Sequence, residues 1–374
     1  MSGISDILTE LKAEHRLRSI PGQPSEGFLD LSSNDYLGLA QRHAEFREEF
    51  TERFSDAPYS SSASRLLSMQ QKYHLMLEAF LAELYGKETL LFNSGYHANV
   101  GCIGALTLPS TLFVCDKLIH ASIVDGLRIN GAEFKRFPHN DIAKLKRILE
   151  KEASRYDHLI VVVESIYSMD GDEAPLSELV ALKQQYPSIL LYVDEAHAFG
   201  VRGKRGLGLC EEYDLIKHAD ILIGTFGKAA ASIGAFAVVT EEMKSFLINT
   251  ARPFIFSTAL PPVNVAWSLL MTEKIIGMEN ERRHLAEISH YFSERISEIS
   301  SQPTGSDSQI IPYLTGSAQR ALDIADKLRQ AGYLALPIRR PTVPPGGERI
   351  RFSLSAAMTR QELCDVADIL QKIN

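Results

Sequence analysis

The fold is decided by the stretch from residue 189 to residue 228, where two short apolar runs each end in chemically reactive side chains. The first run, residues 189–193, continues as Asp194-Glu195-Ala196-His197, and the second, residues 221–224, continues as Thr225-Phe226-Gly227-Lys228. Runs of this length and composition are typical of buried strands in a parallel sheet. In open α/β sheets, ligands bind at the carboxyl ends of the strands. We therefore expect Asp194, His197 and Lys228 to lie at a ligand site.

Further apolar runs lie on both sides of this stretch and alternate with helical segments. They cover residues 89–92, 111–115, 159–164 and 235–240. An amphipathic helix is predicted over residues 70–85, because Leu77, Phe80, Leu81 and Leu84 recur at helical spacing before Gly86. Alternating strands and helices indicate an α/β domain with a largely parallel sheet.

The chain changes pattern after residues 257–262. A long helical stretch runs to about residue 300, and apolar runs at 310–314 and 350–354 then alternate with helices at 318–331 and at the C-terminus. This order is typical of a smaller α+β domain. We predict an N-terminal arm over residues 1–45, a large α/β domain over 46–265 and a small C-terminal α+β domain over 266–374.

Composition excludes several classes of protein. The 374 residues carry a formal net charge of −8 without a Lys/Arg cluster, which argues against a nucleic-acid binder. No apolar run approaches the roughly 20 residues that span a bilayer, and the N-terminus lacks the apolar stretch of a signal peptide. The four cysteines form no CxxC pair, so neither a metal site nor a disulfide framework is expected. We expect a soluble cytoplasmic protein.

Each candidate site residue also has a purely structural explanation. Asp194 could cap a helix, Lys228 could be solvated, and His120 could be a satisfied structural histidine. However, Lys228 lies between an apolar strand and a run of small residues, and a desolvated lysine is the kind that forms Schiff bases. The turn Asn93-Ser94-Gly95-Tyr96 opens a helix and offers backbone N–H groups to an anion.

The order of these elements is more specific than any of them alone. An anion-binding turn, a histidine, a strand-end Asp-x-x-His and a strand-end lysine together strongly resemble fold-type-I pyridoxal-phosphate (PLP) enzymes. Five strings narrow the resemblance to the α-oxoamine synthases, at residues 31–39, 94–99, 164–172, 193–200 and 224–228. The resemblance implies the fold of the aspartate aminotransferase-like PLP-dependent transferases.

The resemblance also implies roles in binding PLP. Lys228 would carry the cofactor as a Schiff base and later act as a base, while Asp194 would pair with the pyridine nitrogen. His120 would stack on the ring, and His197 and Ser168 would lie near the ring oxygen. The phosphate would be bound by Gly95, Tyr96, Thr225 and, from a neighbouring subunit, Ser257 or Thr258. That sharing predicts a homodimer with active sites at its interface.

Residues 64–68 and 338–344 favour the family member that joins L-alanine to a pimeloyl thioester, either pimeloyl-CoA or a pimeloyl carrier protein, with loss of CO2. Arg339 is the candidate for the amino-acid carboxylate, because a guanidinium binds a carboxylate at two points. Arg340 is its rival. The resemblance implies further substrate residues, namely Asn34, Thr342 and, at the substrate mouth, Arg18 ahead of Arg16.

The chain departs from the family at two places. Relatives usually carry glycines where Ser60-Ser61-Ser62-Ala63 stand, and often one near Ala231. The first departure leaves the acyl-chain selectivity open.

Two alternative functions are compatible with these residues. Sister enzymes such as 2-amino-3-ketobutyrate CoA ligase, 5-aminolevulinate synthase or a serine palmitoyltransferase-like enzyme would share the Lys228 chemistry, and a catalytically silent PLP-binding partner subunit would retain the same residues. A nicotinamide-dependent dehydrogenase is disfavoured because no Gly-x-Gly-x-x-Gly turn follows the first strand. Hydrolase and metalloprotease motifs are missing from the sequence as well.

Overall fold

The computed structural model describes residues 2–20, 22, 27–186 and 188–373. Contacts divide the chain into two compact units. The large unit comprises Asp35–Ser168 and Glu173–Arg283, and the small unit comprises Met1–Asn34, Met169–Asp172 and His284–Asn374. Residues of the predicted arm belong to the small unit through a short parallel strand pair, in which Leu29 lies beside Tyr333 and Asp30 beside Leu334.

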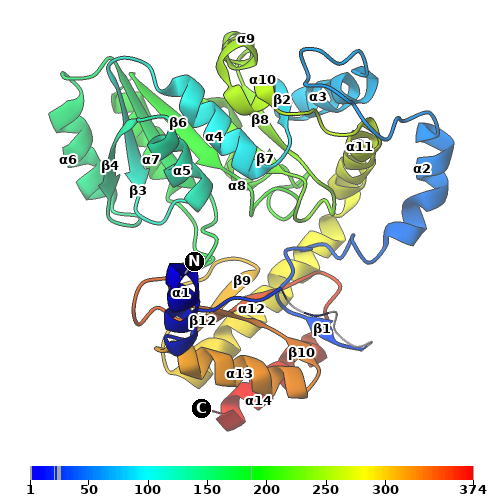
Figure 1. Cartoon of the computed structure of the whole chain (residues 1–374), viewed down its shortest axis with the longest axis vertical. Helices are drawn as coiled ribbons and strands as arrows, with labels where there is room; N and C mark the ends of the chain where they lie inside the picture. Colours follow the sequence, from blue (N-terminus) through cyan, green and yellow to red (C-terminus); the bar gives the residue numbers. More distant parts are fainter. Residues whose placement is uncertain (1, 21, 23–26, 187, 374) are drawn as a thin grey trace. The chain divides into compact units, whose positions relative to one another are not determined.

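A seven-stranded sheet forms the centre of the large unit, with the strand order β2-β8-β7-β6-β5-β3-β4 (Figure 1). Strands β7, β6, β5, β3 and β4 run parallel, and β8 is antiparallel to both of its neighbours. The mostly parallel sheet of the prediction is therefore confirmed. The strands are β2 Glu88–Phe92, β3 Thr111–Asp116, β4 Glu133–Phe137, β5 His158–Glu164, β6 Ile189–Asp194, β7 Ile221–Thr225 and β8 Ala235–Val239.

Six of these strands coincide with the predicted apolar runs to within one residue at each end. The exception is β4, whose sequence Glu133-Phe134-Lys135-Arg136-Phe137 carries three charged residues. It lies at the edge of the sheet and pairs with β3 alone. An edge strand needs no continuous apolar run, so hydrophobicity could not reveal it.

Both faces of the sheet are buried. Alternate strand residues such as Ile160 and Val162 belong to one apolar core together with Cys102 and Ile103, whereas Val161 and Val163 point to the opposite face. Helix α4 packs on the first face against β7, β8 and β2, while α7 packs on β6 and α6 on β4. The helices of the large unit include α2 Arg47–Phe54, α3 Lys72–Tyr85, α4 Gly95–Leu106, α5 Ala121–Ile129, α6 Ile142–Glu152, α7 Leu176–Gln185, α8 Leu209–Glu212, α9 Glu241–Thr250, α10 Arg252–Phe256 and α11 Pro262–Gly277, with 3-10 turns η1 His43–Phe46 and η2 Ile216–His218.

The predicted stop of the first long helix is confirmed. Gly86 follows α3 with a φ of 65°, and its N–H donates to the carbonyl of Ala82. Glycine adopts this left-handed conformation without the steric cost that a Cβ would add. The chain can then turn directly into β2.

The small unit contains an antiparallel sheet and a short parallel pair. The sheet has the order β11-β12-β9, and β1 pairs with β10. Helix α12, Glu279–Ser300, begins in the large unit and continues into the small one. The other elements are α1 Ser2–Ala13, β1 Leu29–Asp30, β9 Ile310–Leu314, α13 Ala318–Gln330, β10 Tyr333–Leu334, β11 Leu336–Ile338, β12 Arg349–Ser353 and α14 Arg360–Ile373.

Across the part of the chain that the structure describes, every helix is either too short or too polar to span a bilayer.

Candidate active site

Reactive side chains gather at the carboxyl ends of the central strands, as the sequence predicts. Asp194, the last residue of β6, lies in register with Glu164, the last residue of β5, and with Ile223 of β7. Thr225 ends β7, and Lys228 follows three residues later. The parallel arrangement thus brings an acid from β6 and an amine after β7 to the same edge of the large unit.

Asp194 is held by two hydrogen bonds that fix the orientation of its carboxylate. Its Oδ1 accepts from the backbone N–H of Ala196 at 2.9 Å, and its Oδ2 accepts from the side-chain amide of Asn99 at 2.8 Å. The residue is only 4% exposed. Tyr192 donates to Asn99 Oδ1 at 2.7 Å, which fixes the amide with its NH2 group toward Asp194.

His120 is joined to this network through Ser122. Asn99 Nδ2 lies 2.9 Å from Ser122 Oγ, and that hydroxyl lies 2.7 Å from His120 Nδ1, which also accepts the Ser122 N–H. Desolvation lowers the pKa of His120; Asp194 opposes this shift, and the charge of Lys228 adds to it. The imidazole of His120 is therefore neutral at neutral pH. The residue is also exposed to solvent, so a ligand can reach it.

Glu164 is a second buried acid at this edge. It is 2% exposed, and desolvation, together with repulsion from Asp194, raises its pKa well above the ordinary value. Two neighbouring buried carboxyls resist double ionisation. Glu164 therefore holds a proton far more readily than an ordinary carboxyl group does.

The loop that carries Lys228 is tightly packed. Thr225 Oγ1 donates to the carbonyl of Gly234 at 3.0 Å and accepts from the N–H of Gly227 at 3.2 Å. A Cβ on Gly200, whose φ is +87°, would lie 2.5 Å from the Cβ of Ala229, so only glycine allows this approach. The Lys228 backbone is therefore confined from both sides.

The predicted anion-binding turn lies beside Thr225. Ser94 caps α4 by accepting from the N–H of His97, and a Cβ on Gly95 would lie 3.9 Å from Thr225 Cβ. The first N–H groups of the helix, including those of Gly95 and Tyr96, thus begin next to a threonine hydroxyl. This is the donor set that a phosphate prefers.

Ser257 and Thr258 lie near the same turn within one chain. The side-chain amide of Asn93 donates to Ser257 Oγ at 3.1 Å and to the Thr258 carbonyl at 2.6 Å. Their action across a subunit boundary stays a prediction.

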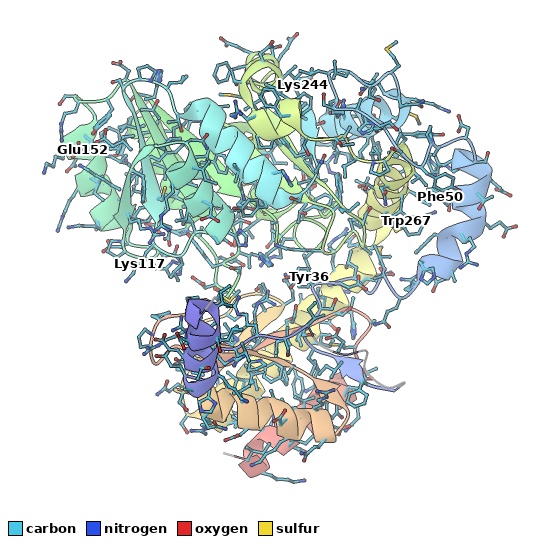
Figure 2. All side chains as sticks on the ribbon, viewed as in Figure 1. Tyr36, Phe50, Lys117, Glu152, Lys244 and Trp267 are labelled. Carbon is cyan, nitrogen blue, oxygen red and sulfur yellow. The ribbon has the colours of Figure 1, made fainter. Side chains whose placement is uncertain are left out.

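His197 is held by a tyrosine that the sequence left without a role. Tyr36 OH lies 2.6 Å from His197 Nδ1, and both residues are buried (Tyr36 is labelled in Figure 2). Ser168 is buried as well and follows β5 by four residues. The Nδ1 contact fixes the imidazole ring and leaves Nε2 as its second polar atom.

The predicted substrate residues belong to the small unit, where the structure adds Arg351. This arginine is 7% exposed, and its guanidinium donates to Asn34 Oδ1 at 3.2 Å. Ser353 Oγ donates to the same oxygen at 3.3 Å. Arg349, Arg351 and Ser353 alternate on one face of β12, and Arg349 forms an ion pair with Asp170.

Arg18 and Arg339 occupy a different part of the small unit. They line a cavity of about 890 Å³ together with Arg16, Arg340 and Thr342. Arg18 donates to Thr342 Oγ1 at 2.8 Å, and Arg339 donates to the carbonyl of His15. Desolvation and the neighbouring charge of Arg18 lower the pKa of Arg339. Two adjacent guanidiniums form a site that favours an anion.

Asn99, Glu164 and Arg351 are the site residues that sequence reasoning did not assign. Asn99 left a detectable signal, because it is a polar residue on the face of α4 that otherwise buries Ala98, Cys102 and Ile103. Arg351 left one too, since it is a charged residue within the predicted strand at 350–354. Their partners, Asp194 and Asn34, are far away in the sequence and could not be inferred from these patterns.

Together, the large-unit residues suit PLP. An oriented buried carboxylate can face the ring nitrogen, a neutral imidazole can stack on the ring, and a helix N-terminus beside a hydroxyl can bind the phosphate. Lys228 is close enough for its charge to shift the pKa values of His120 and Glu164, which places its amine within the same site.

Comparison with known proteins also points to a PLP-dependent enzyme family. The family described as aminotransferase class I and II matches residues 26–370. The 8-amino-7-oxononanoate synthase of Haemophilus ducreyi is 44% identical over 381 residues, covering 97% of this chain and 98% of that protein.

Two solved structures show the likeness in three dimensions. The 8-amino-7-oxononanoate synthase of Francisella tularensis superposes with a TM-score of 0.80 at 26% identity, covering 93% of this chain and 98% of that chain. A variant of the serine palmitoyltransferase of S. paucimobilis with a bound PLP–myriocin aldimine gives a TM-score of 0.89 at 26% identity, covering 99% of this chain and 96% of that chain.

Proposed function

The chain belongs to the α-oxoamine synthases, PLP-dependent acyltransferases with the class I and II aminotransferase fold, and from this premise we propose the reaction that it catalyses. The proposed reaction joins L-alanine to a pimeloyl thioester and releases CO2 and the free thiol. Its product is 8-amino-7-oxononanoate. The biotin-pathway relative of Haemophilus ducreyi, similar over nearly the whole chain, supports this choice of substrates.

PLP, when bound, supplies an electron sink for the electron pair released at the α-carbon of the amino acid. Asp194, whose carboxylate is held in one orientation by Asn99 and the Ala196 N–H, would pair with the pyridine nitrogen. His120 would pack on the ring as a neutral imidazole. Lys228 would hold the cofactor covalently and would act as the general base for the α-proton of the amino acid.

The small unit would bind the carboxylates of the two substrates. We assign the alanine carboxylate to Arg351, because its guanidinium lies beside Asn34, the predicted partner of that group. Arg18 and Arg339 would then bind the free carboxylate at the far end of the pimeloyl chain, since both line one cavity with Thr342. In this proposal Arg351, rather than Arg339, binds the amino-acid carboxylate.

The chain of contacts from Asp194 through Asn99 and Ser122 to His120 is the observation that carries the proposal. It joins the acid that would pair with the ring nitrogen to the imidazole that would pack on the ring in one hydrogen-bonded network. If Asp194 served only to stabilise the fold, it would need neither His120 nor Lys228 nearby.

An activity matrix tests the proposal. The purified enzyme with PLP is incubated with alanine, glycine or serine against acetyl, succinyl, pimeloyl and palmitoyl thioesters of CoA and of a carrier protein, and thiol release is followed. We expect turnover with alanine and a pimeloyl thioester, and mass spectrometry should detect 8-amino-7-oxononanoate. Turnover of glycine with acetyl-CoA and none with alanine would assign the chain to a sister enzyme.

The silent-subunit alternative is tested in the same assay. Reduction with borohydride should attach the cofactor to Lys228. Covalent labelling without thiol release from any thioester would show a PLP-binding protein that lacks this activity.

A further inference from the structure

The chain turns sharply immediately after Lys228, and the turn closes on a strained residue. The N–H of Ala231 donates to the Lys228 carbonyl at 2.9 Å. Ala231 has a φ of +45°, in the left-handed region that a residue with a Cβ rarely adopts. The turn that begins at the predicted cofactor lysine therefore ends in a conformation that alanine does not favour.

Trp267 contacts this strained residue directly. Its indole N–H donates to the Ala231 carbonyl at 3.1 Å, and the adjacent Ser268 hydroxyl lies 2.8 Å from Ser232 Oγ. Two consecutive residues of α11 thus contact two consecutive residues after the turn.

Aromatic packing fixes the indole. Its ring lies edge-on to Phe50 of α2 at 5.5 Å and to Phe46 at 6.4 Å between centroids, and Figure 2 shows Phe50 and Trp267 side by side. Both partners belong to the large unit. A donor held in this way costs little rotamer entropy when it binds the carbonyl.

We propose that Trp267 is a positioning residue for Lys228: its N–H holds Ala231 in the left-handed conformation and thereby keeps the turn that presents the lysine closed. The inference rests on the proposed role of Lys228 and extends it to a residue that touches neither cofactor nor substrate. It also explains how this chain uses alanine at a position where left-handed geometry favours glycine.

A double-mutant cycle of Trp267→Phe and Ala231→Gly, measured on the PLP-loaded enzyme, tests the inference. Phenylalanine keeps an aromatic ring but lacks the donor, and glycine adopts the turn without needing it. The two readouts are the dissociation constant for PLP and the pH midpoint of the visible band of the bound cofactor, which responds to the geometry of its lysine linkage.

We expect Trp267→Phe to weaken PLP binding about threefold to tenfold, as the loss of one hydrogen bond does, and to shift the pH midpoint. In the Ala231→Gly background the same substitution should change PLP binding by less than about twofold, since no strain remains to be offset. Tyr213→Phe is the matched control, because it removes a hydrogen-bond donor from an exposed aromatic side chain elsewhere in the large unit, and it should leave both readouts unchanged.

An effect of Trp267→Phe that is equal in both backgrounds, or no effect in either, would overturn the inference. A second measurement needs no substitution, because the chain has a single tryptophan. Its indole N–H should exchange with solvent at least about tenfold more slowly once PLP binds, and unchanged exchange would contradict the inference.

Failure of the proposed function would be recognised separately. Borohydride labelling of the wild-type chain at a lysine other than Lys228 would remove the premise itself, whatever the outcome of the cycle.

Discussion

Asp194 depends for its role on three other side chains, two of which belong to other elements. Asn99 of α4 donates to it, Tyr192 of the same strand orients that amide, and Glu164 of β5 stays neutral beside it. The orientation of the Asp194 carboxylate is thus a property of the network around it.

At the scale of single residues, Asn99→Ala tests this network. The substitution removes the donor to Asp194 Oδ2, and hydrogen bonds to charged groups contribute about 1.5–3 kcal/mol. We expect kcat/KM to fall about tenfold to 150-fold. Asn249→Ala, an exposed asparagine in α9, is the control and should be neutral. An Asn99→Ala enzyme with wild-type kinetics would show that Asp194 is held without the amide.

Lys228→Ala tests the covalent role of the amine. Loss of the general base should lower turnover by at least about 10²-fold to 10⁴-fold, and borohydride should no longer attach the cofactor. The control is Lys117→Ala, an exposed lysine that is labelled in Figure 2. Mass spectrometry of the reduced protein gives the site of labelling. Labelling that persists in the variant would reveal another cofactor lysine.

Helix α3 contains a buried histidine whose titration affects the stability of the large unit. Burial, with the nearby charge of Arg65, lowers the pKa of His74 to about 4. The ordinary value is about 6.5, so the folded state resists protonation. The stability linked to His74 is fully present above pH 6.5 and is lost as the pH falls toward 4.

His74→Leu should therefore remove part of the acid sensitivity. From these pKa values, the wild type loses about 2.5 kcal/mol of unfolding free energy at His74 between pH 7.5 and pH 4.5. The His74→Leu variant should not show this loss of unfolding free energy. His290→Leu replaces an exposed histidine of α12 and should lose as much unfolding free energy as the wild type. Urea unfolding at both pH values measures the difference. Equal losses in all three proteins would contradict the predicted shift.

At the scale of the whole molecule, exposed apolar side chains support the predicted homodimer. Tyr59, Leu67 and Met69 are 86%, 77% and 95% exposed, and Phe256 is 70% exposed. The two segments that carry them are adjacent, because the N–H of Ala259 donates to the carbonyl of Ala63. Apolar surface of this kind marks an interaction site.

Leu67→Glu tests this surface. A charge buried in an apolar interface without a partner should weaken self-association at least about tenfold. Ile129→Glu is the control, because Ile129 is 69% exposed but lies on α5. Sedimentation velocity over a range of protein concentrations measures the association. If the two variants associate equally, the exposed surface formed by Tyr59, Leu67, Met69 and Phe256 is not the dimer interface.

The sequence by itself determined the sheet and the reactive groups at its edge. Apolar runs between helical segments predicted six strands of the large unit, and the residues after them supplied Asp194, His197 and Lys228. These features are local, since strand formation and turn placement depend on neighbouring residues. The charged edge strand β4 could not be predicted from hydrophobicity, because it is held in the sheet by pairing with β3.

Only the tertiary structure decided which side chains meet. Asn99 and Asp194 are 95 positions apart, and Arg351 and Asn34 are 317 apart. The same holds for Trp267 and Ala231, which are joined by a hydrogen bond between α11 and the Lys228 turn. Hydrophobic periodicity shows which face of an element is buried but not which polar group lies opposite, because that pairing is set by how elements pack against one another.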